Sequence, residues 1–127
     1  MEDRPLYELD QMLVPVDAEY FRIECLDPQI AAELQKMMEE TMISGTGAGL
    51  DLSVAAGSKT GSAESVQAGQ EVVHGWITGY VPADDPQYVI TAFIENGRSG
   101  RGSAGPVFSH VANYMYENGL LEYETAF

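Results

Sequence analysis

The chain has 127 residues and a mass of 13.8 kDa, which is enough for one small domain. Apolar residues make up 45% and charged residues 20%, so the composition is that of a folded globular domain rather than a disordered chain. Six Lys and Arg against twenty Asp and Glu give a net charge of −14, which disfavours binding to nucleic acid or anionic lipid, because both require an excess of cations.

The sequence contains no pattern that predicts a disulfide or a metal site. Cys25 is the only cysteine, which leaves no partner for an internal disulfide. His74 and His110 stand apart, without a cluster of cysteines or acids, so we expect no metal and no cofactor. No apolar run reaches the roughly 18–20 residues of a membrane span. The acidic start of the chain is unlike a secretory signal, and we therefore expect no targeting or membrane segment in it.

The first strongly patterned element is a helix from Pro28 to Ile43, which follows an extended acidic lead-in over residues 1–24. Asp27 is a good N-cap, because its carboxylate accepts an unpaired backbone N–H, and proline costs no hydrogen bond at the first helical position. Gly45 is expected to be the C-cap. Spacings of three and four predict one buried face, formed by Ile30, Leu34, Met37, Met38 and Thr41.

Three strands are predicted next, over residues 53–63, 72–81 and 87–96. The second and third are nearly continuous in apolar and aromatic residues, which indicates that both faces of the sheet are covered. The short segment from Pro82 to Pro86 predicts that these two strands form an antiparallel hairpin. Four aromatic side chains are assigned to the sheet core: Trp76, Tyr80, Tyr88 and Phe93.

A second helix is predicted from Pro106 to about Asn118, after a Gly, Ser and Arg loop over residues 97–103, with Gly119 at its end. Its apolar stripe comprises Val107, Phe108, Val111, Ala112 and Met115. The order helix, three strands, helix predicts an α+β fold for residues 25–127. In it, an antiparallel sheet of at least three strands is flanked by an N-terminal and a C-terminal helix.

The segment from Gly57 to Glu64 carries the clearest chemical signal. One of only two lysines, Lys59, stands in the middle of a strand of Gly, Ser and Thr. A phosphate-binding loop needs glycine directly before the lysine and a helix after it. Here Ser58 precedes the lysine and the following residues are extended, so nucleotide binding is rejected.

On the edge strand of a cleft, these residue types suit the binding of a carboxylate. Side chains alternate along a strand, so Thr60 and Ser62 share one face and can offer two hydroxyls, while Lys59 adds positive charge nearby. Gly61 leaves room for a substrate backbone, and the N–H of Ser62 can serve as an oxyanion donor. A surface strand with incidental small residues is the alternative when the Lys-Thr-Gly triplet is considered by itself.

The segment Lys59–Glu64 resembles the third motif of the penicillin-binding transpeptidases and serine β-lactamases. Further segments resemble the penicillin-binding proteins in the correct order: Gly45–Gly47, His74–Pro82, Asp85–Val89, Ile94–Gly97 and Gly102–Phe108. The resemblance runs from about residue 20 to residue 119, and the hairpin with Trp76 makes it closer to the class B transpeptidases than to the β-lactamases. It implies a fragment of the β-lactamase/transpeptidase-like fold that corresponds to the C-terminal third of the transpeptidase domain.

Two other motifs of that family are missing from the sequence. The family nucleophile lies in Ser-x-x-Lys, but Glu33 and Ala56 stand three residues before the two lysines. No asparagine has a serine two residues before it, so the Ser-x-Asn motif is also absent. Without the nucleophile and its base the acyl-enzyme route is closed. We therefore expect the isolated chain neither to cross-link peptidoglycan nor to bind penicillin covalently.

By resemblance, the intact protein would be a serine-type D,D-transpeptidase that cross-links peptidoglycan at the outer face of a bacterial cytoplasmic membrane. Lys59 would support the protonation state of the serine motifs, and the Ser62 N–H would give half of the oxyanion hole. Substrate-binding residues would be Thr60, Gly61 and Ser62. The implied partners are the remainder of the transpeptidase domain and a stem peptide or β-lactam. The second hypothesis is a non-catalytic module that binds a partner carrying the missing part, or pairs with itself as a homodimer.

Overall fold

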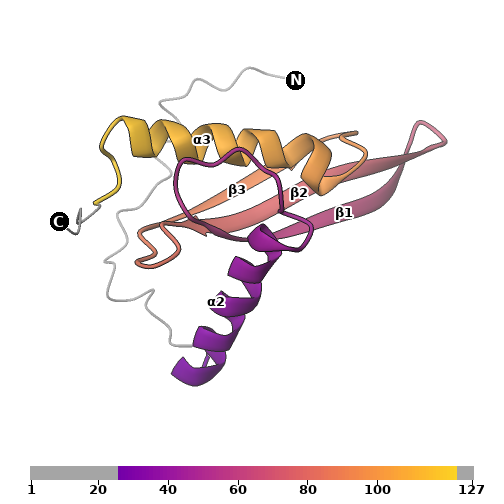
Figure 1. Cartoon of the computed structure of the whole chain (residues 1–127). Helices are drawn as coiled ribbons and strands as arrows, with labels where there is room; N and C mark the ends of the chain where they lie inside the picture. Colours follow the sequence, from indigo (N-terminus) through magenta and orange to yellow (C-terminus); the bar gives the residue numbers. More distant parts are fainter. Residues whose placement is uncertain (1–25, 123–127) are drawn as a thin grey trace, which may run out of the picture.

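The structure is a computed structural model and describes residues 26–122. The predicted lead-in over residues 1–24 lies outside the described residues, so the boundary at residue 24 stays a prediction. An antiparallel sheet has one helix before it and one after it, which confirms the α+β class (Figure 1). The elements follow in the order α2 (Pro28–Ile43), β1 (Gly57–Gln67), β2 (Gln70–Val81), β3 (Tyr88–Ile94), the π-helical turn η2 (Gly100–Ala104) and α3 (Gly105–Glu117).

Helix α2 has the predicted bounds because its start is chemically marked. The carboxylate of Asp27 accepts the backbone N–H two residues further on at 2.8 Å, as an N-cap does. The C-cap differs from the prediction: it is Ser44 and not Gly45, and the Ser44 N–H donates to the carbonyl of Glu40 at 2.9 Å. The helix therefore ends through its own backbone hydrogen bonds one residue before the glycine.

The three strands form one sheet in the order β1-β2-β3, and each neighbouring pair is antiparallel, which confirms the predicted hairpin of β2 and β3. β1 pairs with β2 along its whole length, and the turn Ala68-Gly69 has φ values of 50° and 78°, as a two-residue hairpin turn requires. β1 begins and ends four residues later than predicted. The preceding segment instead buries Val54 and Ala56 in the core as irregular chain.

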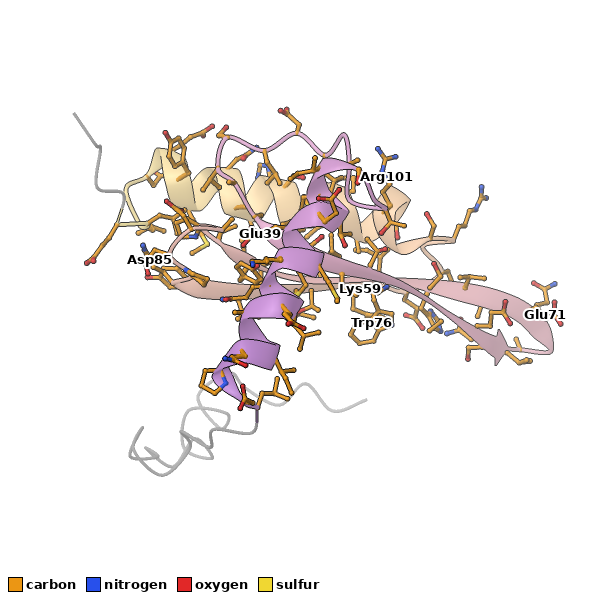
Figure 2. The ribbon with its side chains drawn as sticks, turned by 60° about the horizontal axis from the view of Figure 1, so that its bottom comes forward. Glu39, Lys59, Glu71, Trp76, Asp85 and Arg101 are labelled. Carbon is orange, nitrogen blue, oxygen red and sulfur yellow. The ribbon has the colours of Figure 1, made fainter. Side chains whose placement is uncertain are left out.

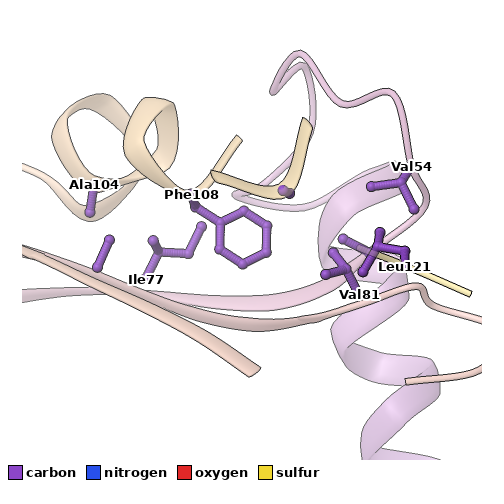
Figure 3. Close-up of a cluster of buried hydrophobic side chains, with 9 residues drawn as sticks. Val54, Ile77, Val81, Ala104, Phe108 and Leu121 are labelled. Atoms are coloured by element: carbon purple, nitrogen blue, oxygen red, sulfur yellow. The ribbon is translucent and has the colours of Figure 1, made fainter. Parts of the chain in front are cut away.

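Helix α3 covers one face of the sheet, and the core lies between them (Figure 3). Phe108 of α3 is fully buried, and Gly79 of β2 makes room for its ring, because a Cβ there would come within 2.8 Å of the ring. The buried apolar cluster comprises Val54, Ala56, Ile77, Val81, Ala92, Ala104, Phe108, Ala112 and Leu121. Full burial of one such large side chain contributes about 1.5–3 kcal/mol, so this interface holds α3 on the sheet.

The opposite face of the sheet is only partly covered among the described residues: α2 covers it at Tyr80, but the part around Trp76 and Phe93 is open, so the prediction that both faces are covered is wrong for that part. Trp76 and Phe93 are 42% and 46% exposed, and their rings pack against each other with centroids 4.4 Å apart. Tyr88 is exposed as well, so only Tyr80 of the four aromatic side chains assigned to the core is buried. Continuous apolar patterning indicates a face that a partner can cover, but it does not indicate which segment covers it.

The apolar face of α2 is also exposed, although its spacing predicts burial. Ile30, Leu34 and Met37 are 42–64% exposed, and no residue of the helix is buried. Figure 1 shows α2 standing away from the sheet, with the end that leads into the following loop nearest to β1. Met38 and Thr41, the other two residues of the predicted face, are half-buried, so the face is covered only in part within residues 26–122.

A π-helical turn precedes α3, within the segment that the sequence predicts to be a loop of Gly, Ser and Arg. The turn η2 occupies residues 100–104 and leads directly into α3. Gly119, with φ of 66°, ends the helix as predicted. The predicted apolar stripe is only partly buried, because two of its members lie at the side of the helix and are about 40% exposed: Val107 and Val111.

Candidate functional site

The segment Lys59–Ser62 lies in the middle of β1, which is an edge strand of the sheet. Its first and last residues are exposed and its middle two are half-buried. The residue before it, Ser58, is fully buried, and its hydroxyl donates to Sδ of Met42 at 2.8 Å. The segment is therefore extended and accessible, while the strand leading into it is fixed against α2.

The open edge of β1 presents the backbone groups of Thr60 and Ser62. Nζ of Lys59 donates to the carbonyl oxygen of Thr60 at 2.6 Å, so this carbonyl points away from β2. Peptide groups in an antiparallel strand face alternately toward and away from the partner strand. The N–H of Ser62, two residues further on, therefore faces the same open edge. A positively charged ammonium group and an N–H that the sheet does not use lie along one edge.

The hydroxyls of Thr60 and Ser62 lie on the sheet face that carries α3. Thr60 is opposite the buried Ile77, and directly opposite residues share a face. Oγ1 of Thr60 donates to Oγ1 of Thr46 at 2.8 Å, and Oγ of Ser62 accepts the N–H of Gly100 at 3.3 Å. The loop after α2 and the turn before α3 therefore each bind one of the two hydroxyls.

Sequence reasoning missed the parts that Thr46 and Gly100 play at this strand. Their partners are 14 and 38 residues away along the chain, so the contacts depend on tertiary packing. One signal was available in the glycines that flank Thr46. A Cβ at Gly45 would come within 2.8 Å of the backbone Cα of Thr41, so glycine lets the chain turn closely past the end of α2.

Gly61 and Gly100 lack side chains for different reasons. A Cβ at Gly100 would meet the backbone oxygens of Gly61 and Trp76 far inside the 3.4 Å at which ordinary contact begins, so glycine allows η2 to pack directly on β1 and β2. A Cβ at Gly61 would meet Cβ of Trp76 at 3.6 Å, which is ordinary contact. Packing among the described residues therefore does not require glycine at position 61, and the space above it is available to a ligand.

Positive charge is concentrated around this strand. Of the four basic side chains among residues 26–122, Lys59 lies in β1, Arg101 lies in η2, which contacts β1 through Gly100, and Arg98 lies in the loop that binds β2 at Val73. Figure 2 shows Lys59 on β1 near Trp76 and away from Glu71 at the hairpin end. In a chain with a net charge of −14, this region is suited to an anionic group.

Tyr80 attaches α2 to the sheet beside the site. Its ring crosses β1 over Gly57, where a Cβ would collide with the ring. Its hydroxyl donates to the carbonyl of Gln35 at 3.0 Å, and Oε1 of Glu39 lies 3.3 Å away. Burial, the negative charge of Glu39 and the hydrogen bond to it raise the pKa of Tyr80 to about 12. Tyr80 is therefore a structural donor that stays protonated at neutral pH.

Other polar candidates have structural partners. Nδ1 of His74 accepts the N–H of Asn96 at 3.1 Å, and Oε1 of Glu95 accepts from Gln67 at 2.6 Å, which ties the end of β3 to the hairpin. No group of three or more His, Cys, Asp and Glu gathers as metal ligands in the described part of the chain. Neither of the two helices described combines the length and apolar character that a bilayer crossing needs.

Comparison with known proteins relates these features to a family. The family model of the penicillin-binding protein transpeptidase domain matches residues 15–113. The chain is 35% identical over 51 residues to the peptidoglycan D,D-transpeptidase MrdA of Haemophilus influenzae. That match covers 40% of this chain and 8% of the relative.

Solved structures of related proteins share the fold. The complex of penicillin-binding protein PBP2 with MreC from Helicobacter pylori matches with a TM-score of 0.63 and 27% identity, over 76% of this chain and 19% of that chain. Pseudomonas aeruginosa PBP2 in complex with WCK 5153 matches with a TM-score of 0.64 and 28% identity, over 83% and 23%. These matches confirm a fragment of the β-lactamase/transpeptidase-like fold, and the chain spans about a fifth of the length of these structures.

Proposed function

The chain belongs to the penicillin-binding protein transpeptidase family, and on this premise we propose that β1 supplies the Lys-Thr-Gly wall of an active site that cross-links peptidoglycan. The observation that carries the proposal is the position of Lys59–Ser62 on an accessible sheet edge, with an ammonium group beside it. The substrate class is a peptide with a terminal carboxylate. The reaction of the completed site is acyl transfer through a serine of the missing part.

The proposed roles divide charge, hydrogen bonding and space among four neighbouring residues. Lys59 attracts the carboxylate and supports the protonation state of the serine motifs. The hydroxyls of Thr60 and Ser62 bind the carboxylate of a substrate or β-lactam, and hydrogen bonds to a charged group contribute about 1.5–3 kcal/mol each. The Ser62 N–H at the open edge is half of the oxyanion hole, where loss of one donor costs roughly 3–4 kcal/mol in the barrier. Gly61 leaves room for the substrate backbone.

We further propose that this chain is inactive alone. Its sequence contains neither Ser-x-x-Lys nor Ser-x-Asn, so no residue can form the acyl-enzyme. A fluorescent penicillin incubated with the chain should leave no covalent label after denaturing electrophoresis. Stoichiometric labelling would contradict the proposal, because it would require a nucleophile outside the Ser-x-x-Lys motif.

The remainder of the transpeptidase domain is the proposed partner. It would cover the exposed sheet face with Trp76 and Phe93 and the exposed face of α2, which have no cover among the described residues. The related PBP2 structures were solved with MreC and with WCK 5153. We place the intact protein in cell-wall synthesis at the extracytoplasmic face of the membrane, where it would bind stem peptides or β-lactams along β1.

Carboxylate binding by the wall can be tested on the chain as it exists. A peptide ending in D-Ala-D-Ala is titrated into the ¹⁵N-labelled chain, and the same peptide with a C-terminal carboxamide serves as the control. We expect amide shifts at Lys59–Ser62 for the free carboxylate alone, with a dissociation constant of about 1 mM or weaker, because half of the site is missing. Equal shifts with both peptides, or shifts elsewhere, would contradict the proposed roles.

A matched pair of variants tests whether the carboxylate peptide binds on the sheet face that carries Thr60. Thr60→Val removes a proposed ligand hydroxyl, whereas Thr78→Val removes the hydroxyl that pairs with Thr91 at 2.9 Å on the opposite face. The first should weaken the shifts caused by the carboxylate peptide, and the second should leave them unchanged. Equal losses in both variants would show that the binding does not involve this wall.

A self-associating module is the second candidate function, favoured by the edges of β1 and β3 and the apolar faces that residues 26–122 leave unpaired or exposed. The net charge of −14 opposes pairing of two copies, and salt screens this repulsion. Light scattering should then report a dimer fraction that grows with protein and salt concentration. A mass of 13.8 kDa under all conditions would reject this candidate.

A further inference from the structure

We propose that Thr46 is a positioning residue for the carboxylate-binding hydroxyl of Thr60, an inference that rests on the proposed function of β1. Their Oγ1 atoms are 2.8 Å apart, and Thr60 is the donor. A threonine hydroxyl has one proton to donate and two lone pairs. While Thr60 donates to Thr46, it therefore has no proton for a ligand.

A bound carboxylate would reverse this hydrogen bond. The carboxylate can only accept, so Thr60 must turn its proton toward the ligand. Thr46 then donates its own proton to the oxygen of Thr60, and both hydroxyl oxygens remain hydrogen-bonded. Successive hydroxyls in such a chain polarise one another, which strengthens the bond at the charged end. Thr46 would act through Thr60 in this arrangement and would not touch the ligand.

The loop that carries Thr46 is fixed on both sides, as a positioning role requires. The N–H of Gly47 donates to the carbonyl of Thr41 at 3.0 Å, which ties the loop to the end of α2. The guanidinium group of Arg101 donates from Nε and Nη2 to the carbonyl of Ala48 at 3.2 and 2.6 Å. Thr46 is exposed between these two anchors, so its place depends on them rather than on burial.

The turn η2 connects this loop with the other hydroxyl of the motif. Arg101 binds the Thr46 loop, and its neighbour Gly100 donates to Oγ of Ser62 at 3.3 Å. Both hydroxyls on the α3 face are thus positioned from outside β1, one by the loop after α2 and one by η2. Ser62 accepts from Gly100 and keeps its own proton, so it can donate to a carboxylate without any rearrangement.

Two substitutions distinguish the role of the Thr46 hydroxyl from the role of the side-chain shape. Thr46→Val keeps the branched side chain without the hydroxyl, and Thr46→Ser keeps the hydroxyl. With the free-carboxylate D-Ala-D-Ala peptide as probe, Thr46→Val should weaken binding about 5-fold, and Thr46→Ser should stay within about 2-fold of the wild type. Equal affinities of the wild type and Thr46→Val would overturn the proposal.

A second readout decides the role of Thr46 without a ligand. Three-bond couplings to the methyl group of Thr60 report its χ1 rotamer. We expect one rotamer in the wild type and in Thr46→Ser, and averaging among rotamers in Thr46→Val. An unchanged Thr60 rotamer in Thr46→Val would overturn the proposal. If the wild type binds no peptide but the rotamer effect is present, the proposed function of β1 fails and the positioning of Thr60 by Thr46 stands.

Discussion

Replacing Gly100 with alanine should separate η2 from the strand that carries the motif. The new Cβ would overlap the backbone oxygens of Gly61 and Trp76, and relief to ordinary contact requires a shift of about 1 Å. Backbone atoms in two paired strands cannot move aside as a side chain can. Overpacking of this kind costs about 1–3 kcal/mol, and the hydrogen bond from Gly100 to Ser62 adds roughly 1 kcal/mol when it is lost. We expect Gly100→Ala to lower the free energy of unfolding by about 2–4 kcal/mol.

Urea unfolding followed by the fluorescence of Trp76 measures this change, because the chain has a single tryptophan and it adjoins the contact. Gly61→Ala is the matched control, since its Cβ would meet Cβ of Trp76 at an ordinary 3.6 Å. That variant should be as stable as the wild type or up to about 1 kcal/mol more stable, because alanine suits a strand better than glycine does. Equal destabilisation by both substitutions, or an unchanged Gly100→Ala variant, would refute the reasoning.

Three further predictions concern the core, the Tyr80 contact and the helix cap. Phe108→Ala should lower the free energy of unfolding by about 3–5 kcal/mol, and the half-exposed Val111→Ala by clearly less; equal losses in urea titrations would contradict the packing. The pKa of Tyr80 is raised from 10.0 to about 12. The contribution of the protonated Tyr80 hydroxyl to the free energy of unfolding is therefore complete below pH 10 and is lost as pH rises toward 12. Urea unfolding between pH 10 and pH 12 should show this loss of stability, on the order of 1–2 kcal/mol, in the wild type and not in Tyr80→Phe. The same pH dependence in both proteins would exclude Tyr80 as its source. Asp27→Ala should cost α2 about 1 kcal/mol of helix stability and reduce helical circular dichroism, whereas unchanged ellipticity would show that the cap is dispensable.

The sequence predicts well what short-range chemistry determines. The bounds of α2 follow from a capping carboxylate at Asp27, and the end of α3 follows from Gly119 in a conformation that favours glycine. The hairpin of β2 and β3 follows from apolar strands separated by a short proline-rich segment. The turn Ala68-Gly69 was missed because its alanine, at φ of 50°, lacks the usual Asn or Asp signal, and β1 was therefore predicted to end too early.

Burial and long-range contacts were predicted less well, because they depend on what packs against a segment. The apolar spacing of α2 and the apolar content around Trp76 indicate faces that can be covered, but the described residues cover these faces only in part. The contact of Thr46 with Thr60 joins two polar residues 14 positions apart, and neither periodicity nor capping signals it. The family motif marked Lys59–Ser62, and the structure adds the loop and the turn that bind its hydroxyls.

The most direct test of the carboxylate-binding wall is the measurement of intermolecular nuclear Overhauser effects between the chain and a bound D-Ala-D-Ala peptide. If β1 binds the terminal carboxylate, the methyl group of the last D-alanine should show nuclear Overhauser effects to protons of Gly61 and Thr60. Effects confined to the hairpin end near Val66, to α3, or to no residue at saturating peptide would contradict the account.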